Sequence, residues 1–76
     1  MIKEHDRIVL TCDVAPNGLK AGDVGTVIHI YERGKAVEVE FLALDGETLA
    51  IATLRADQVR PIARGEITHA RHLATT

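Results

Sequence analysis

Serine and tryptophan are absent from the 76-residue sequence, and cysteine, tyrosine and phenylalanine each occur once. Without serine the chain has no serine nucleophile. The single cysteine, Cys12, has no partner within the chain for a disulfide, and it leaves too few thiolates for the common four-ligand Cys/His zinc sites. These absences exclude serine hydrolases and disulfide-stapled folds, and they argue against a structural zinc domain.

The shortage of aromatic side chains argues against two kinds of binding site. A proline-peptide groove of the eukaryotic SH3 type is lined by several aromatics. Single-stranded RNA and DNA are usually held on aromatic platforms beside a basic track. Tyr31 and Phe41 alone provide neither arrangement.

An excess of positive charge and long apolar runs are also missing. The formal net charge is -2 at pH 7, with acidic residues spread along the chain. This balance removes the usual electrostatic basis for nonspecific binding to nucleic acid or to an anionic membrane. No apolar run has membrane-spanning length, and residues 1–6 do not resemble a secretory signal. We therefore expect a cytoplasmic protein with no membrane contact.

Branched aliphatic residues are plentiful, since Ile, Val and Leu each occur seven times. They are enough for the core of one small domain, and a chain of this length buries about 60% of its unfolded surface. The longest β-type run, Val24–Tyr31, is rich in β-branched residues, which favour a strand over a helix. Gly25 within it is predicted to mark a bend or a close backbone approach. With Gly22 it would also fit a phosphate loop, but no helix-forming segment follows to supply an anion site.

Strand patterns and turn residues predict an all-β fold. The expected strands are Asp6–Thr11, Val24–Tyr31, Ala36–Phe41, Thr48–Leu54 and Val59–Ile62, with one helical turn at Ala56–Gln58. Glu32–Lys35 and Asp45-Gly46 are predicted to be the turns of two hairpins.

The third predicted strand has the cleanest alternation in the chain. Val37, Val39 and Phe41 are expected in the core, and Glu38 and Glu40 in water. Two carboxylates on one strand face would also suit acid–base or metal chemistry. No third ligand is placed beside them, so we interpret this face as solvated.

The fourth predicted strand lacks a polar face. Leu49 and Ile51 lie on one side, and Ala50, Ala52 and Leu54 lie on the other. A strand that is apolar on both sides is usually covered on both sides. One cover is the core, and the other is the C-terminal tail or a second subunit. The pattern predicts self-association, and we assign Ala50, Ala52 and Leu54 to the candidate contact surface.

The long loop over residues 13–22 is the second candidate contact region. Its Pro16-Asn17-Gly18 sequence has turn chemistry, because proline presets φ while asparagine and glycine tolerate positive φ. Loops of this length often bind, which makes Asn17 a candidate contact residue. The alternative is an ordinary loop held by Val14 and Leu19.

Residues 63–76 lose the strand pattern and are expected to form a tail after a domain at residues 1–62. One alternative is a short helix with Ile67, Ala70 and either Leu73 or Ala74 on one stripe, and the other is a tail without regular structure. Ile67 and Leu73 complete the candidate contact surface.

The segments Lys20–Tyr31, Val37–Phe41 and Ala56–Ile62 resemble a bacterial family of short stand-alone proteins known only as a domain of unknown function. The resemblance covers residues 2–62. It implies a small five-stranded SH3-like barrel and carries no catalytic residue over. Gly22–Ile30 is more distantly similar to the glycine-valine strand of KOW-type barrels and to the barrel of nitrile hydratase β subunits. The acidic balance departs from the KOW pattern.

Few side chains suggest catalysis or metal binding. Cys12 with His5 as base would make a nucleophile pair, but a lone cysteine beside a strand is more typical of a small buried hydrophobe. His69 and His72 would share a helix face, yet no carboxylate or cysteine is placed to complete a metal site. His29 is predicted on the outer face of the second strand. We assign no catalytic, cofactor-binding or metal-binding residue and expect a protein that is not an enzyme.

Three functions follow, in order of preference. The first is a noncatalytic protein-interaction module that forms a homo-oligomer, with a protein encoded nearby as a further partner. The second is a KOW-like nucleic-acid or ribosome-associated factor in which Lys20, Arg33 and Lys35 contact phosphate from neighbouring loops. The third is a small subunit of a larger enzyme assembly.

Overall fold

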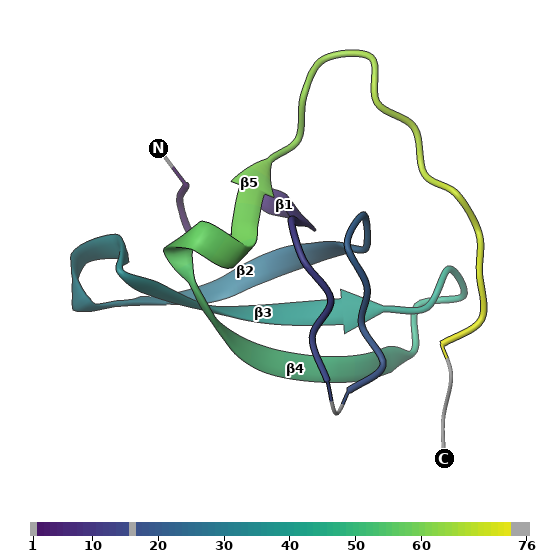
Figure 1. The fold of residues 1–76 in the computed structure, drawn as a ribbon, viewed down its shortest axis with the longest axis horizontal. Coiled ribbons are helices and arrows are strands. Elements are labelled where there is room, and N and C mark those ends of the chain that lie inside the picture. The colour runs from purple at the N-terminus through teal and green to yellow at the C-terminus, as the bar shows by residue number, and fades with distance from the viewer. Residues whose placement is uncertain (1, 16, 74–76) are drawn as a thin grey trace.

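The computed structural model describes residues 2–15 and 17–73, and it contains one five-stranded antiparallel sheet in the order β4-β3-β2-β1-β5 (Figure 1). The strands are β1 Arg7–Leu10, β2 Val24–Tyr31, β3 Ala36–Leu42, β4 Thr48–Arg55 and β5 Val59–Pro61. Two short 3-10 turns, η1 Glu32–Gly34 and η2 Ala56–Gln58, follow β2 and β4. The predicted all-β fold, with one helical turn before the last strand, is confirmed.

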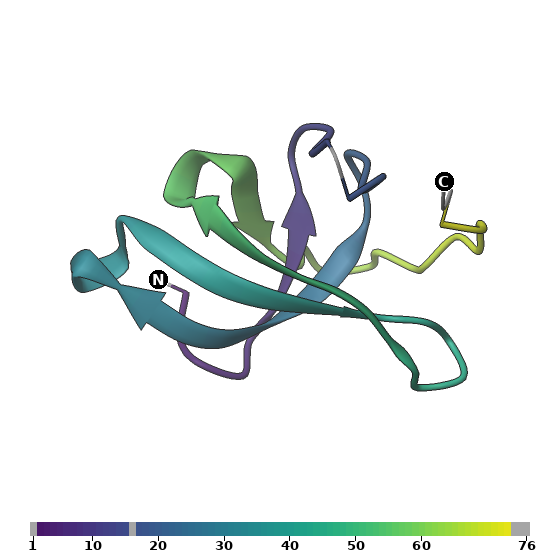
Figure 2. The same ribbon diagram turned by 90° about the horizontal axis from the view of Figure 1, so that it is seen from below.

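The sheet is strongly curled, as the two views in Figures 1 and 2 show. β4 and β5 lie at opposite ends of the strand order, yet only the three residues of η2 join them. In a flat sheet these strands would be about 19 Å apart, because neighbours are spaced by about 4.8 Å. A three-residue 3-10 turn spans about 6 Å. The short connection therefore requires the two edges to curl towards each other.

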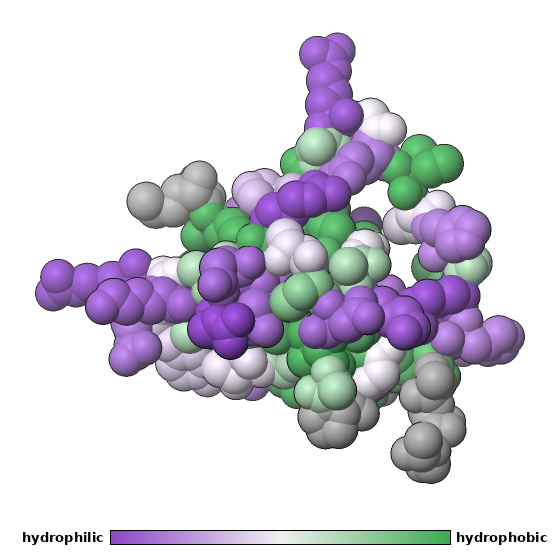
Figure 3. Space-filling model, viewed as in Figure 1, coloured by the Kyte–Doolittle hydropathy of each residue, from purple (hydrophilic) through white to green (hydrophobic). Residues whose placement is uncertain are grey.

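The core lies inside the curl and is almost entirely aliphatic. Its buried members are Ile8, Leu10, Leu19, Val27, Val37, Val39, Phe41, Ala52, Leu54 and Val59. The predicted alternation of β3 is confirmed, since its three apolar side chains are buried and its two glutamates are not. In Figure 3 the hydrophobic side chains of the viewed face gather mainly towards the middle of the molecule, and hydrophilic ones project at the periphery.

β1 is buried on both faces. Ile8 and Leu10 belong to the core, and Val9 on the other face of the strand is also buried, with 5% of its surface exposed. β1 pairs with β2 on one side and β5 on the other. Val9 lines a groove that residues 66–73 of the C-terminal tail also line. The second face of β1 therefore lies on the side of the sheet where the tail runs.

Gly25 allows β2 to pack closely against β3. A Cβ at this position would lie 2.8 Å from Cε1 of Phe41 and closer still to Cγ1 of Val39. Both contacts are below normal van der Waals separation. The sequence-based interpretation of this glycine as a close approach is confirmed. Gly22 has φ of +96°, a backbone conformation that glycine adopts readily in a loop.

The two predicted loop features are also present. Val14 and Leu19 form an isolated antiparallel bridge, and Leu19 is buried, so the β1–β2 loop is held as expected. The β3–β4 hairpin turns at Asp45-Gly46, where Gly46 has φ of +96° and donates its N–H to the carbonyl of Ala43 at 2.9 Å.

Residues 62–73 form no helix, so the helical alternative for the tail is wrong over this described range. The tail arches away from β5 and returns along one side of the molecule (Figure 1), where Arg71 contacts Gly18 and Asp23 of the β1–β2 loop. Side-chain contacts to the loop hold it, and a short helix in water is marginal by itself. Ala74, named in the predicted stripe, lies outside the described residues. No helix in the described part of the chain is long and apolar enough to cross a membrane.

Candidate functional site

The outward apolar side chains of β4 are Leu49 and Ile51, which are 42% and 51% exposed. Ala52 and Leu54 are buried in the core, with 9% and 2% of their surfaces exposed. The assignment of Ala52 and Leu54 to a contact surface is therefore wrong. Ala50 is half-buried and packs against the core, so its place in a contact surface stays a prediction.

The register between β3 and β4 explains this orientation. Directly opposite residues on two antiparallel strands share a face of the sheet. The observed pairs are Val37 with Leu54, Val39 with Ala52, and Phe41 with Ala50. Because the β3 members of these pairs form the core, their β4 partners must face it too.

β4 is also an edge of the sheet. No strand in the described part of the chain pairs with its outer side. Its residues Thr48–Leu54 include no charged side chain, and the strand ends at Arg55. Exposed edges are usually protected from pairing by charges, prolines or a short length. We define the β4 surface as this free edge together with Leu49 and Ile51.

Polar groups border the β4 surface on its inner side. Ile51 lies opposite Glu40 in the sheet, and the Glu40 carboxylate accepts a hydrogen bond from Oγ1 of Thr48 at 2.7 Å. Thr53 lies opposite Glu38. The apolar pair is thus flanked by carboxylates, and this arrangement is typical of the rim of an interaction surface.

The remaining predicted contacts lie in the loop and the tail, and Ile67 and Leu73 line a groove that Leu49 of the β4 surface also lines. Asn17 is exposed, Ile67 is 93% exposed, and Leu73 is partly buried against the core. Arg71, between the last two, joins the tail to the loop. Its guanidinium pairs with the carboxylate of Asp23 and donates to the carbonyl of Gly18 at 3.1 Å.

The Asp23–Arg71 pair was not predicted, because nothing in the local sequence links residues 48 positions apart. Burial acts to raise the pKa of Asp23. The hydrogen bond from Arg71, the backbone N–H of Lys20 and the positive charges of both residues outweigh it and lower the pKa below the ordinary 3.8. The carboxylate is therefore held ionised and able to anchor the tail.

A second polar cluster lies on the outer face of the β2–β3 hairpin. His29 faces outward, as predicted, with its Nδ1 3.6 Å from a carboxylate oxygen of Glu4. Its ring packs edge-on against Tyr31 at a centroid separation of 4.4 Å. The Tyr31 hydroxyl donates to Glu38, and this hydrogen bond, aided by burial and the carboxylate's charge, raises the pKa of the phenol.

The structure separates the cations proposed to bind phosphate. Lys20 precedes β2, whereas Arg33 and Lys35 follow it. A strand of eight residues is about 26 Å long. The three side chains therefore do not form neighbouring loops, and no single phosphate track joins them.

The proposed nucleophile pair does not form. His5 lies before β1, where its N–H donates to the carbonyl of Val27 at 2.7 Å. Cys12 lies beyond the other end of β1 and accepts a hydrogen bond from Nε2 of Gln58 at 3.7 Å. Within residues 2–15 and 17–73, no three His, Cys, Asp or Glu side chains gather as a metal site would require.

Comparison with known proteins identifies a family. The chain matches the family model described as Domain of unknown function (DUF4926) over residues 4–61. No curated protein and no solved structure matched the chain. The matched range contains all five strands and both 3-10 turns. Because it also covers more than half of the sequence, the protein belongs to the DUF4926 family of domains of unknown function.

Proposed function

We propose that the protein is a noncatalytic interaction module that self-associates by pairing its β4 with β4 of a second copy. The observation that carries this proposal is the β4 surface, an eight-residue edge strand whose first seven residues are uncharged and which exposes two aliphatic side chains. Adding a strand to a free edge satisfies backbone groups that otherwise face water.

The pairing would be antiparallel about a two-fold axis, which places the same surface on both copies. Leu49 and Ile51 of each copy would then lie on one face of a continuous ten-stranded sheet. Full burial of such a side chain contributes about 1.5–3 kcal/mol, and these two are already about half buried. A strong dimer buries about 800 Å² per copy, so we expect a weak, micromolar dimer.

The proposed fold family is the SH3-like barrel in a bacterial cytoplasmic protein. Its support is the strand order, the curl that a three-residue η2 requires, and the bridged β1–β2 loop. In such a barrel β4 stays an edge, because η2 turns the chain away to the other end of the sheet. The fold therefore leaves the outer edge of β4 free to pair with a second copy.

The test is the variant Ile51→Lys, compared with the wild type by sedimentation velocity across the micromolar range. Ile51 lies opposite Glu40, so a lysine there gains a cross-strand carboxylate and keeps the monomer folded. In the dimer it would bring two cations together near the two-fold axis. We expect the dissociation constant to rise at least about tenfold, equal to about 1.4 kcal/mol.

The matched control is Ile67→Lys, because Ile67 is even more exposed and lies in the tail, outside the β4 surface. This variant should sediment as the wild type does. Loss of the dimer in Ile67→Lys with retention in Ile51→Lys would contradict the proposal and direct attention to the tail.

A further inference from the structure

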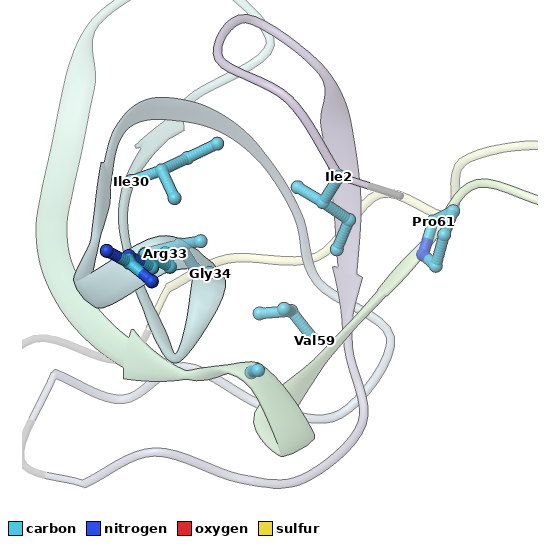
Figure 4. Close-up of a pocket in the computed structure, with 8 residues that line it drawn as sticks. Ile2, Ile30, Arg33, Gly34, Val59 and Pro61 are labelled. Carbon is cyan, nitrogen blue, oxygen red and sulfur yellow. The ribbon is translucent and has the colours of Figure 1, made fainter.

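An apolar cavity lies beside the β2–β3 turn, between the N-terminal segment and β5 (Figure 4). Its volume is about 590 Å³, within the about 300–1,000 Å³ typical of small-molecule sites. Ile2, Ile30, Val37 and Val59 supply most of the apolar wall. The cavity is separate from the β4 surface, with which it shares no residue.

Arg33 is the one charged residue that lines this cavity. In Figure 4 Arg33 and Gly34 lie on one side of it, and Ile2 and Pro61 on the other. Arg60 and Arg71 are each held by a carboxylate. Among the described residues, no carboxylate comes within ion-pair distance of Arg33, so its five N–H donors remain available.

The backbone of η1 adds a second, independent observation. Arg33 has φ of 59° and ψ of 35°, and Glu32 before it also has a positive φ of 49°. These left-handed conformations suit glycine or asparagine, and larger residues adopt them at a cost. Strained residues concentrate at ligand-binding positions. A guanidinium thus occupies a position where glycine would be easier to accommodate.

We propose that this cavity binds a small monoanionic carboxylate with an apolar body, and that Arg33 binds the carboxylate. A guanidinium matches a carboxylate through two parallel N–H···O bonds, which a point cation does not reproduce. The aliphatic walls take up the hydrocarbon part of the ligand. The site accepts one charge, because it presents a single cation.

The test uses three probes with the same eight-carbon chain: octanoate, octanol and octylammonium. Each is titrated into the full-length protein, below the micelle concentration of the charged probes and the solubility limit of octanol, and followed by amide NMR shifts. Octanoate should shift the resonances of Gly34, Val37 and Val59, with an affinity about tenfold above that of octanol, as expected for one charge-assisted pair. Octylammonium should bind more weakly than octanol.

The variant Arg33→Gly separates binding from folding. Glycine accepts positive φ readily, so this variant should be at least as stable as the wild type. It should lose the about tenfold preference for octanoate over octanol. Lys35→Gln is the matched control, since it removes a nearby cation that does not line the cavity; it should retain the preference.

Three results would overturn the proposal. The first is equal binding of all three probes, and the second is octanoate shifts confined to other parts of the molecule. The third is an Arg33→Gly variant that keeps the full preference for octanoate. Because the dimer proposal concerns β4 alone, repeating the titration in Ile51→Lys distinguishes failure of one proposal from failure of the other.

Discussion

At residue 25 the absence of a side chain lets β2 lie against β3, and the same contact makes that position intolerant of substitution. The space that a Cβ would need is occupied by Val39 and Phe41, both in the core. Both neighbours belong to β3, which pairs with β2 on one side and β4 on the other, and both are buried. A methyl group at position 25 must therefore displace core side chains instead of loop atoms.

We predict that Gly25→Ala lowers the free energy of unfolding by about 1–3 kcal/mol, the usual cost of overpacking a core. The midpoint of urea denaturation measures the effect. Thr26→Ala, the next residue and only partly buried, is the control and should change stability by no more than about 0.5 kcal/mol. Equal midpoints for Gly25→Ala and the wild type would show that β2 and β3 are not in close contact here.

Tyr31 provides a second prediction for a single residue. Its pKa is raised because the protonated phenol donates to Glu38, and deprotonation would lose this bond and set two negative charges together. Glu38→Gln should therefore move the pKa back towards 10. The chain has one tyrosine and no tryptophan, so ultraviolet absorbance follows this group alone. An unchanged pKa in Glu38→Gln would mean that the two side chains do not meet.

At the scale of elements, the strands could be predicted from the sequence almost to the residue, because β-branched runs and turn residues act locally. The predicted strand Ala36–Phe41 is one residue shorter than the observed β3, Ala36–Leu42. The predicted helical turn Ala56–Gln58 coincides with η2. Val24–Tyr31 agrees with β2 in the same way.

Which side of β4 faces the core could not be decided from the sequence of the strand itself, because the side chains on both sides are apolar. It depends on pairing with β3, and the Asp45-Gly46 turn supplied a signal that could have been used. Pairing back from that turn places Ala50 opposite Phe41, which leaves Ile51 outside. The bulge at Leu42 also shifts the register near the turn. The left-handed Arg33 and the tail contacts depend on tertiary structure and have no local signature.

The tail is the element whose attachment depends on pH. The pKa of Asp23 is lowered in the folded protein, so the stabilisation from its pairing with Arg71 is complete above 3.8 and is lost as pH falls through the lowered value. Glu66 holds a different part of the chain, the turn after β5. The hydrogen bonds from Arg60 and from the backbone N–H of Ala63 lower the pKa of Glu66 to about 2.

We predict that Leu73 leaves the core as pH falls through the lowered pKa of Asp23, and that the turn held by Arg60 and Glu66 opens as pH falls through about 2. Amide NMR shifts of both segments during an acid titration measure the two steps. Asp23→Asn should release Leu73 already at neutral pH and remove the acid-dependent step. The same acid step in that variant would contradict the assignment of Asp23 as the anchor.

At the scale of the whole molecule, a small curled sheet provides two independent surfaces. The β4 surface is an open edge suited to a second copy, whereas the cavity beside η1 is apolar and is lined by one cation. An apolar and backbone-mediated dimer should persist at high salt, because its contacts are not screened. Phosphate-mediated assembly would weaken steeply with salt.

The most direct test of the account is the mass of the wild-type protein in solution by multi-angle light scattering, measured at several micromolar concentrations and at two salt concentrations. We predict a mass that rises from 8.3 kDa towards twice that value as concentration increases, at both salt concentrations. A mass that stays at 8.3 kDa throughout would contradict self-association through β4.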